Sequence, residues 1–299
     1  MVLQRSQTQA KALERGDEVI AVAISSALDD EQPLLEGLSV LESWGLICRP
    51  QNLSARRWGY LAGDDSTRNG DINPELPAPL MAFARGGWGA ARLLELPQKW
   101  RPGWLLGYSD VTALLWARLA AGFDGGVHGP LLTSLANEPN WSKSRLKSIL
   151  FGQPVSDLRG EPWIGGVATG QLVAANLTVA SHLIGSPHMP NLKGAILILE
   201  DVGEAPYRID RMLTQWRLAG LLQELAGLGF GNFEKCEDLE KVPTIETFQV
   251  QQVLQERSAD LGIPVVGGLP IGHCCGNAAL PLGRKALIDG NRGLLSLNS

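Results

Sequence analysis

The chain has 299 residues, of which 44% are hydrophobic and 19% are charged, and its formal net charge is −5. This length suits two domains with real cores, and an acidic balance without a basic stripe argues against a nucleic-acid partner. The four cysteines lack the paired spacing of a zinc module or a disulfide framework. We expect no secretory leader, no membrane span and a cytoplasmic location.

The first half of the sequence alternates short apolar runs with helical spacing. Strands are expected at 19–24, 46–48, 79–84 and 104–106, and a helix is expected to end at Gly45. This alternation is typical of a parallel sheet with helices on both faces. Ligands of such sheets bind beyond the carboxyl ends of the strands, where Ser25, Ser26, the turn at 85–89 and Ser109 all fall.

The second half of the sequence has a mixed, strand-dominated pattern. Residues 141–162 are polar and contain proline, so we assign them to a linker between a domain at 1–140 and a domain at 163–299. Beyond the linker the pattern predicts β-structure at 165–177, 195–199, 263–268 and 285–289, and an amphipathic helix at 209–225.

The segment 104–116 carries a candidate nucleophile. An apolar run enters Gly107, and Ser109 follows two residues later, ahead of an amphipathic run. This pattern predicts a tight strand-to-helix turn that exposes the Ser109 hydroxyl beside backbone N–H groups able to receive an oxyanion. The alternative is that Ser109 only caps the helix.

A nucleophilic serine needs a base and a group that orients the base. His273 lies in a glycine-flanked loop after a predicted strand, and His128 competes with it. Glu200 ends a predicted strand and is the best-placed orienting carboxylate, whereas Asp201 and Glu204 are interpreted as loop charges.

Several longer motifs occur in an order that is typical of one protein family. They are Tyr60-Leu-Ala-Gly-Asp-Asp65, Asp71-Ile-Asn73, Arg85-Gly-Gly-Trp-Gly89, Gly107-Tyr-Ser-Asp-Val-Thr112, His128-Gly-Pro130, Leu199 to Leu213, Gly272-His-Cys-Cys-Gly-Asn277 and Leu280-Pro-Leu-Gly283. Together they resemble the LD-carboxypeptidases, a family of murein tetrapeptide carboxypeptidases and microcin C self-immunity hydrolases. The resemblance extends from Gly16 to Asp289.

The resemblance implies a serine peptidase with a Ser109, His273 and Glu200 triad. The backbone N–H groups of Gly87 and Asp110 would form the oxyanion hole. It also implies a flavodoxin-like parallel-sheet domain followed by a smaller β-rich domain, a homodimer, a small peptide substrate and no cofactor or metal. Murein tetrapeptide, cleaved to release its C-terminal D-amino acid during wall recycling, is the favoured substrate, and a microcin-like peptide–nucleotide is the alternative.

Substrate contacts are assigned to Arg85, Gly86 and Trp88, although Arg85 could equally anchor its turn. The sequence departs from the family pattern at Trp88, where tyrosine is usual, and at Cys274-Cys275. Three other readings compete: a metal centre at His273 and the cysteines, a thiol hydrolase, and a peptide-binding module without turnover. Adjacent cysteines make a poor tetrahedral ligand pair, and a loop thiol lacks the helix start that lowers its pKa.

Overall fold

The computed structural model describes residues 10–50, 52–238 and 247–297, and the chain forms two compact units. The first unit holds the described residues up to Val155, with Gly185–Pro190 and Ala278–Gly283; the second holds Ser156–Ile184, Asn191–Asn277 and the described residues from Arg284 onward. The second unit thus begins at Ser156, inside the predicted linker at 141–162. Two segments of the predicted domain at 163–299, Gly185–Pro190 and Ala278–Gly283, belong to the first unit instead. Residues 1–9, on which the expectation of no secretory leader depends, lie outside the described residues.

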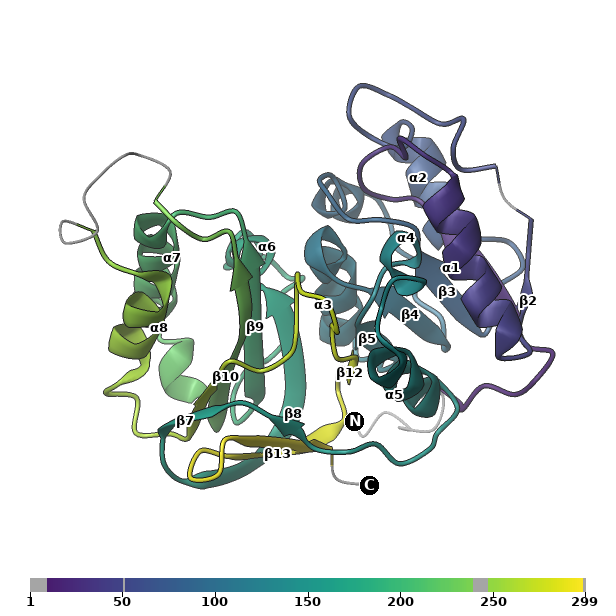
Figure 1. Ribbon diagram of the computed structural model, residues 1–299. Helices are drawn as coiled ribbons and strands as arrows, with labels where there is room; N and C mark the ends of the chain where they lie inside the picture. Colours follow the sequence, from purple (N-terminus) through teal and green to yellow (C-terminus); the bar gives the residue numbers. More distant parts are fainter. Residues whose placement is uncertain (1–9, 51, 239–246, 298–299) are drawn as a thin grey trace, which may run out of the picture. The chain divides into compact units, whose positions relative to one another are not determined.

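The first unit is built on a six-stranded sheet in the order β12-β5-β4-β3-β1-β2 (Figure 1). The five strands β1 to β5 are parallel to their neighbours, and β12 pairs with β5 in the antiparallel sense. The parallel strands follow the flavodoxin-like order 2-1-3-4-5, as the resemblance implied. The bounds are β1 Glu18–Val22, β2 Ile47–Cys48, β3 Leu80–Phe83, β4 Trp104–Gly107, β5 Gly126–His128 and β12 Leu280–Pro281.

Helices cover this sheet and bury its central strands on both faces (Figure 1). All four residues of β3 and all four of β4 are buried, which explains why these strands read as continuous apolar runs. The helix α1 ends two residues before Gly45, whose φ of 92° agrees with the predicted stop. The helices are α1 Gln32–Ser43, α2 Asp65–Ile72, α3 Thr112–Ala120, α4 Leu132–Leu135 and α5 Asn140–Leu150.

Helix α5 occupies much of the segment that the sequence assigned to a linker. The segment 141–162 also contains β6 and the first residues of β7, so it is not an irregular connection. Leu146, Ile149 and Leu150 are buried in the first unit, and Arg145 donates to the carbonyl of Ala279. Two of the buried positions in α5 are serine and arginine. The apolar residues alone therefore do not show the helical spacing.

The second unit is β-rich, with an eight-stranded sheet in the order β6-β14-β13-β8-β9-β10-β11-β7. The strand β8 joins its two parts, because residues 167–171 pair antiparallel with β13 and residues 172–176 pair parallel with β9. Strands β8, β9, β10 and β11 are parallel. The bounds are β6 Leu158–Arg159, β7 Glu161–Ile164, β8 Val167–Asn176, β9 Ile196–Val202, β10 Gly227–Glu234, β11 Val265–Gly267, β13 Lys285–Asp289 and β14 Leu294–Leu297.

Among the described residues, the α-helices that accompany this sheet are α6 Leu177–Ser181, α7 Pro206–Leu218 and α8 Val250–Ser258. The helix predicted at 209–225 begins earlier and ends earlier than expected. Pro206 occupies its first turn, where the missing N–H costs nothing, and Gly220 follows it with a φ of 75°. Helices α7 and α8 lie side by side (Figure 1), and Arg257 of α8 pairs with Asp210 of α7 at 2.7 Å.

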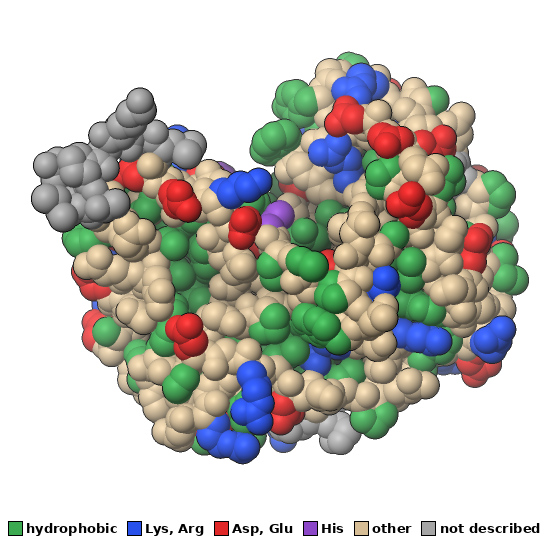
Figure 2. Space-filling model, viewed as in Figure 1, with side chains coloured by type: hydrophobic (Ala, Val, Ile, Leu, Met, Phe, Trp, Pro, Cys, Tyr) green, Lys and Arg blue, Asp and Glu red, His purple; other side chains and the backbone are tan. Residues whose placement is uncertain are grey.

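Charges of both signs are interspersed on the face drawn in Figure 2, and neither sign forms a continuous stripe there. Within the described ranges, every helix is too short or too polar to cross a bilayer.

Candidate active site

The predicted strand-to-helix turn is present at the end of β4. Ser109 has a φ of 63°, in the left-handed region, and begins a 3-10 turn at Ser109–Val111 that leads into α3. A non-glycine residue there costs about 1–3 kcal/mol, and such residues cluster at functional sites. The N-cap of α3 is Val111, and Ser109 begins the 3-10 turn that precedes it.

The glycine-rich turn after β3 lies against Ser109. A Cβ added at Gly86 would lie 3.0 Å from both Cβ and Oγ of Ser109. Gly87 has a φ of 112°, and a Cβ there would lie 2.1 Å from Ser26 Oγ. The N–H of Trp88 donates to Ser26 Oγ at 3.3 Å, and the N–H of Ser26 donates to Gly86 O at 3.3 Å. The loops after β1, β3 and β4 therefore meet at one edge of the sheet, as predicted.

The Asp110 side chain lies beneath these loops. It is only 7% exposed, and its Oδ2 accepts from Ser25 Oγ at 2.6 Å and from the N–H of Ala90 at 2.8 Å. Burial raises the pKa of Asp110, and the hydrogen bond from Ser25 opposes that rise. The carboxylate thus joins the loop after β1 and the end of the glycine-rich turn to the residue after Ser109.

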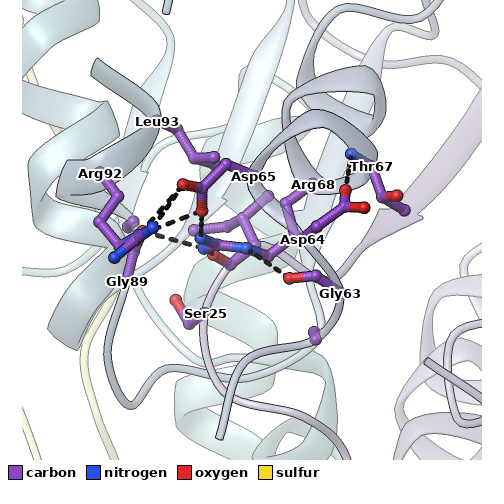
Figure 3. A network of polar contacts seen from close by, with 12 residues as sticks. Ser25, Gly63, Asp64, Asp65, Thr67, Arg68, Gly89, Arg92 and Leu93 are labelled. Atoms are coloured by element: carbon purple, nitrogen blue, oxygen red, sulfur yellow. Dashed lines mark hydrogen bonds and ion pairs between the residues drawn. The ribbon is translucent and has the colours of Figure 1, made fainter. Parts of the chain in front are cut away.

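A buried arginine completes this polar layer (Figure 3). Arg68 of α2 is fully buried and donates to Ile24 O, to Gly89 O at 2.9 Å and to Gly63 O at 3.1 Å. It also pairs with Asp65, which in turn accepts from Arg92 at 2.6 Å. Sequence reasoning placed Ser25 at this edge of the sheet but missed its bond to Asp110. It missed Arg68 entirely, because nothing in the polar sequence of α2 marks one arginine as buried.

Two of the proposed substrate contacts have distinct surroundings. Arg85 donates through Nη1 to Ala27 O at 2.8 Å and to Asp29 at 3.2 Å, so it does anchor the loop after β1. Trp88 is 69% exposed and meets Tyr60 edge to face, with ring centroids 6.5 Å apart. An exposed aromatic pair beside a turn is available for ligand contact.

In the second unit, His273 and Glu200 form a hydrogen-bonded pair. Glu200 lies in β9, has a side chain only 1% exposed, and accepts from His273 Nδ1 at 2.7 Å. Gly272 has a φ of 105°, and a Cβ there would lie 2.5 Å from Glu200 Oε2. Asn277 Oδ1 accepts from the N–H of Gly272 at 2.9 Å and so closes the loop. Only glycine permits this approach of loop and carboxylate.

His128, the competing base, is a fully buried residue of β5. Its ring meets the Tyr108 ring edge to face, with centroids 5.6 Å apart. That environment favours a structural role over proton transfer. His273, with a carboxylate on Nδ1, has the arrangement that fixes an imidazole tautomer.

The sequence interpretation of Asp201 as a loop charge is wrong. Asp201 lies in β9, is 2% exposed, and accepts from Asn176 Nδ2 at 3.0 Å and from Thr178 N and Oγ1 at 2.9 and 2.8 Å. Burial raises its pKa, hydrogen bonding to Thr178 lowers it, and the neighbouring Glu200 raises it. Asp201 therefore fixes the start of α6 beside Glu200.

The cysteines carry no disulfide in the described structure. Burial raises the pKa of both Cys48 and Cys236 to about 11, so neither is an activated thiol. Cys275 is exposed. No group of three or more His, Cys, Asp or Glu side chains within 10–50, 52–238 and 247–297 is arranged to hold a metal ion.

Comparisons with known proteins give a consistent result. The LD-carboxypeptidase N-terminal domain matches residues 19–129, and the LD-carboxypeptidase C-terminal domain matches residues 169–288. A Synechocystis relative, whose name places it provisionally among the carboxypeptidases, is 43% identical over 98% of both chains. The murein tetrapeptide carboxypeptidase of Pseudomonas aeruginosa is 31% identical over 79% of this chain and 81% of its own.

Solved structures agree on the fold. The muramoyltetrapeptide carboxypeptidase of Oxalobacter formigenes superposes with a TM-score of 0.82 at 26% identity, covering 94% of this chain and 97% of that one. The microcin C7 self-immunity protein MccF superposes with a TM-score of 0.82 at 21% identity, covering 97% and 98%. At that identity the second likeness concerns the fold alone.

Proposed function

Because the chain belongs to the LD-carboxypeptidase family, we propose that it is a serine peptidase that removes the C-terminal D-alanine from murein tetrapeptide. The observation that carries the proposal is the buried Glu200 carboxylate on His273 Nδ1 at 2.7 Å, since it leaves Nε2 as the basic nitrogen. The left-handed turn at Ser109 supplies the matching nucleophile.

Ser109 Oγ attacks the carbonyl carbon of the terminal amide while His273 Nε2 takes the hydroxyl proton. The backbone N–H groups of Gly87 and Asp110 stabilise the oxyanion. His273 then gives its proton to the departing D-alanine nitrogen, and the C–N bond breaks. Water, deprotonated by His273, hydrolyses the acyl-enzyme and releases the tripeptide. Glu200 stabilises the imidazolium in both steps.

Substrate recognition is proposed for the turn at 85–89. Gly86 leaves room beside Ser109 for the scissile carbonyl, and Trp88 offers an exposed ring. Arg85 is proposed to attract the C-terminal carboxylate in addition to anchoring its loop, because its side chain is 33% exposed. The cytoplasmic location and the homodimer that the family resemblance implies belong to the same proposal.

The test measures D-alanine release from murein tetrapeptide by wild type, Ser109→Ala and Glu200→Gln. We expect no turnover above background for Ser109→Ala and a fall in kcat of about 10⁴-fold for Glu200→Gln, as when a triad carboxylate is lost. Ser134→Ala, which removes a part-buried hydroxyl that donates to Leu131 O at 3.1 Å, is the matched control. Full activity in Ser109→Ala would refute the proposal.

Two further arms address the alternatives. An aminoacyl-sulfamoyl adenylate, cleaved in place of the tetrapeptide, would favour the microcin-like reaction, and binding of tetrapeptide without release would favour a binding module. Turnover that survives iodoacetamide and a chelator would exclude thiol and metal chemistry.

A further inference from the structure

The Asp110 carboxylate is a shared acceptor at the meeting point of three loops. Its Oδ2 accepts from Ser25 Oγ at 2.6 Å and from the N–H of Ala90 at 2.8 Å. Ser25 is fully buried and Asp110 is 7% exposed, so no bulk water replaces either bond. In a site of low dielectric, such charge-assisted bonds hold their partners more firmly than neutral ones.

The carboxylate belongs to the residue that follows Ser109, and this links it to the strained turn. The φ of 63° at Ser109 persists only where the surroundings hold it. The N–H of Asp110 is also one of the two proposed oxyanion donors. A shift of the Asp110 side chain therefore moves the nucleophile turn and one donor together.

The other end of the same contact fixes the glycine-rich turn. Ala90 ends the segment that begins at Gly86, and the N–H of Ala90 is bonded to Asp110. Arg68 holds Gly89 O at 2.9 Å from the other side. Gly87, the second proposed oxyanion donor, lies between these anchored points and Gly86, whose O accepts from the N–H of Ser26 at 3.3 Å.

We infer that Ser25 is a positioning residue of the hydrolytic reaction: its hydroxyl orients the Asp110 carboxylate, which keeps the Ser109 turn and the Gly87 turn in register. This inference rests on the proposed function. Ser25 itself contacts no reacting atom in this scheme. Ser26, its neighbour, differs because its hydroxyl accepts directly from the N–H of Trp88 at 3.3 Å.

The experiment compares wild type, Ser25→Ala, Asp110→Asn and the double variant in two assays. One assay is steady-state release of D-alanine from murein tetrapeptide. The other is the rate at which a fluorophosphonate phosphonylates Ser109, followed by intact mass; Ser109 Oγ bonds to phosphorus, fluoride leaves, and the hydroxyl proton goes to His273. The second assay does not depend on the choice of peptide.

We expect Ser25→Ala to lower both kcat and the phosphonylation rate about tenfold through lost transition-state stabilisation. KM should stay within twofold of wild type. In the Asp110→Asn background the same change should cost less than twofold, because Ser25 acts through Asp110. Ser258→Ala, which removes another buried serine hydroxyl, bonded to Leu254 O at 2.8 Å in α8, should lower Tm similarly and leave both rates unchanged.

Four results would overturn the inference: unchanged rates in Ser25→Ala, a loss confined to KM, additive losses in the double variant, or an equal loss in Ser258→Ala. A wild type that is phosphonylated at Ser109 but leaves the tetrapeptide intact would remove the substrate assignment alone, and slower phosphonylation of Ser25→Ala would still support the positioning role. A wild type that is not phosphonylated at all would overturn both.

Discussion

Replacing Gly272 by alanine tests the His273–Glu200 pair within the second unit. The new Cβ would lie 2.5 Å from Glu200 Oε2 and 2.7 Å from Glu200 Cβ. The Cβ contact matters most, because Glu200 lies in β9 between β8 and β10 and cannot withdraw without disturbing the sheet. We therefore expect the carboxylate to rotate away and the hydrogen bond at 2.7 Å to break.

The size of the effect has two parts. The left-handed backbone costs a non-glycine residue about 1–2 kcal/mol of stability. Displacement of the carboxylate affects activity instead: misplacement by about 1 Å costs about 10²-fold, and loss of the correct tautomer costs about 10⁴-fold. The expected fall in kcat lies between these values.

Gly203→Ala separates the two parts. Gly203 has a φ of 72°, but a Cβ there meets no heavy atom within 4 Å. Both variants should lose Tm through backbone strain, and Gly272→Ala should lose more because of its contact with Glu200. Gly272→Ala alone should lose D-alanine release and the downfield Nδ1 proton signal of His273. Gly272→Ala with kcat/KM within threefold of wild type would show that the pair does not depend on this contact, and the reasoning would fail.

Three further outcomes follow from the structure. Gly87→Ala should lower kcat about 10²-fold or more, the typical effect of losing an oxyanion donor, since its Cβ would lie 2.1 Å from Ser26 Oγ; wild-type kcat would exclude Gly87 from that role. Trp216→Ala should destabilise the protein by about 3–5 kcal/mol, because Trp216 is fully buried and its Nε1 donates to Ser181 Oγ at 2.8 Å; an unchanged urea midpoint would contradict this. Cys236, whose pKa burial raises from 9.0 to about 11, should be about 0.1% thiolate at pH 8, and its alkylation by iodoacetamide should quicken about tenfold per pH unit up to pH 10. Fast labelling of Cys236 at pH 8, measured by peptide mass, would refute that shift.

The sequence was most informative where one local rule decides the outcome. Apolar runs located β1, β3 and β4, and the glycine and serine after β4 located the turn at Ser109. The fold class followed from the alternation of these runs with helical spacing, and the family from several motifs in order. Each of these signals lies within a short segment.

What escaped prediction depends on contacts between distant segments. The buried roles of Arg68 and Ser25 arise only when α2 and the loop after β1 meet the glycine-rich turn. Asp201 was interpreted as a loop charge because Glu200 and Asp201 follow an apolar run that suggests the end of a strand. In the structure β9 continues through both residues. Helix α5 was hidden because serine and arginine occupy positions that its period buries.

The edge strand β12 has a consequence for biosynthesis. Leu280 pairs with His128, so the sheet of the first unit acquires β12 only after residue 281 has emerged from the ribosome, more than 150 residues after β5. Until then the outer edge of β5 lacks its native neighbour, and an uncovered edge is a template for pairing with other chains. Nascent chains released before residue 280 should therefore aggregate or recruit chaperones more readily than chains released just after residue 283.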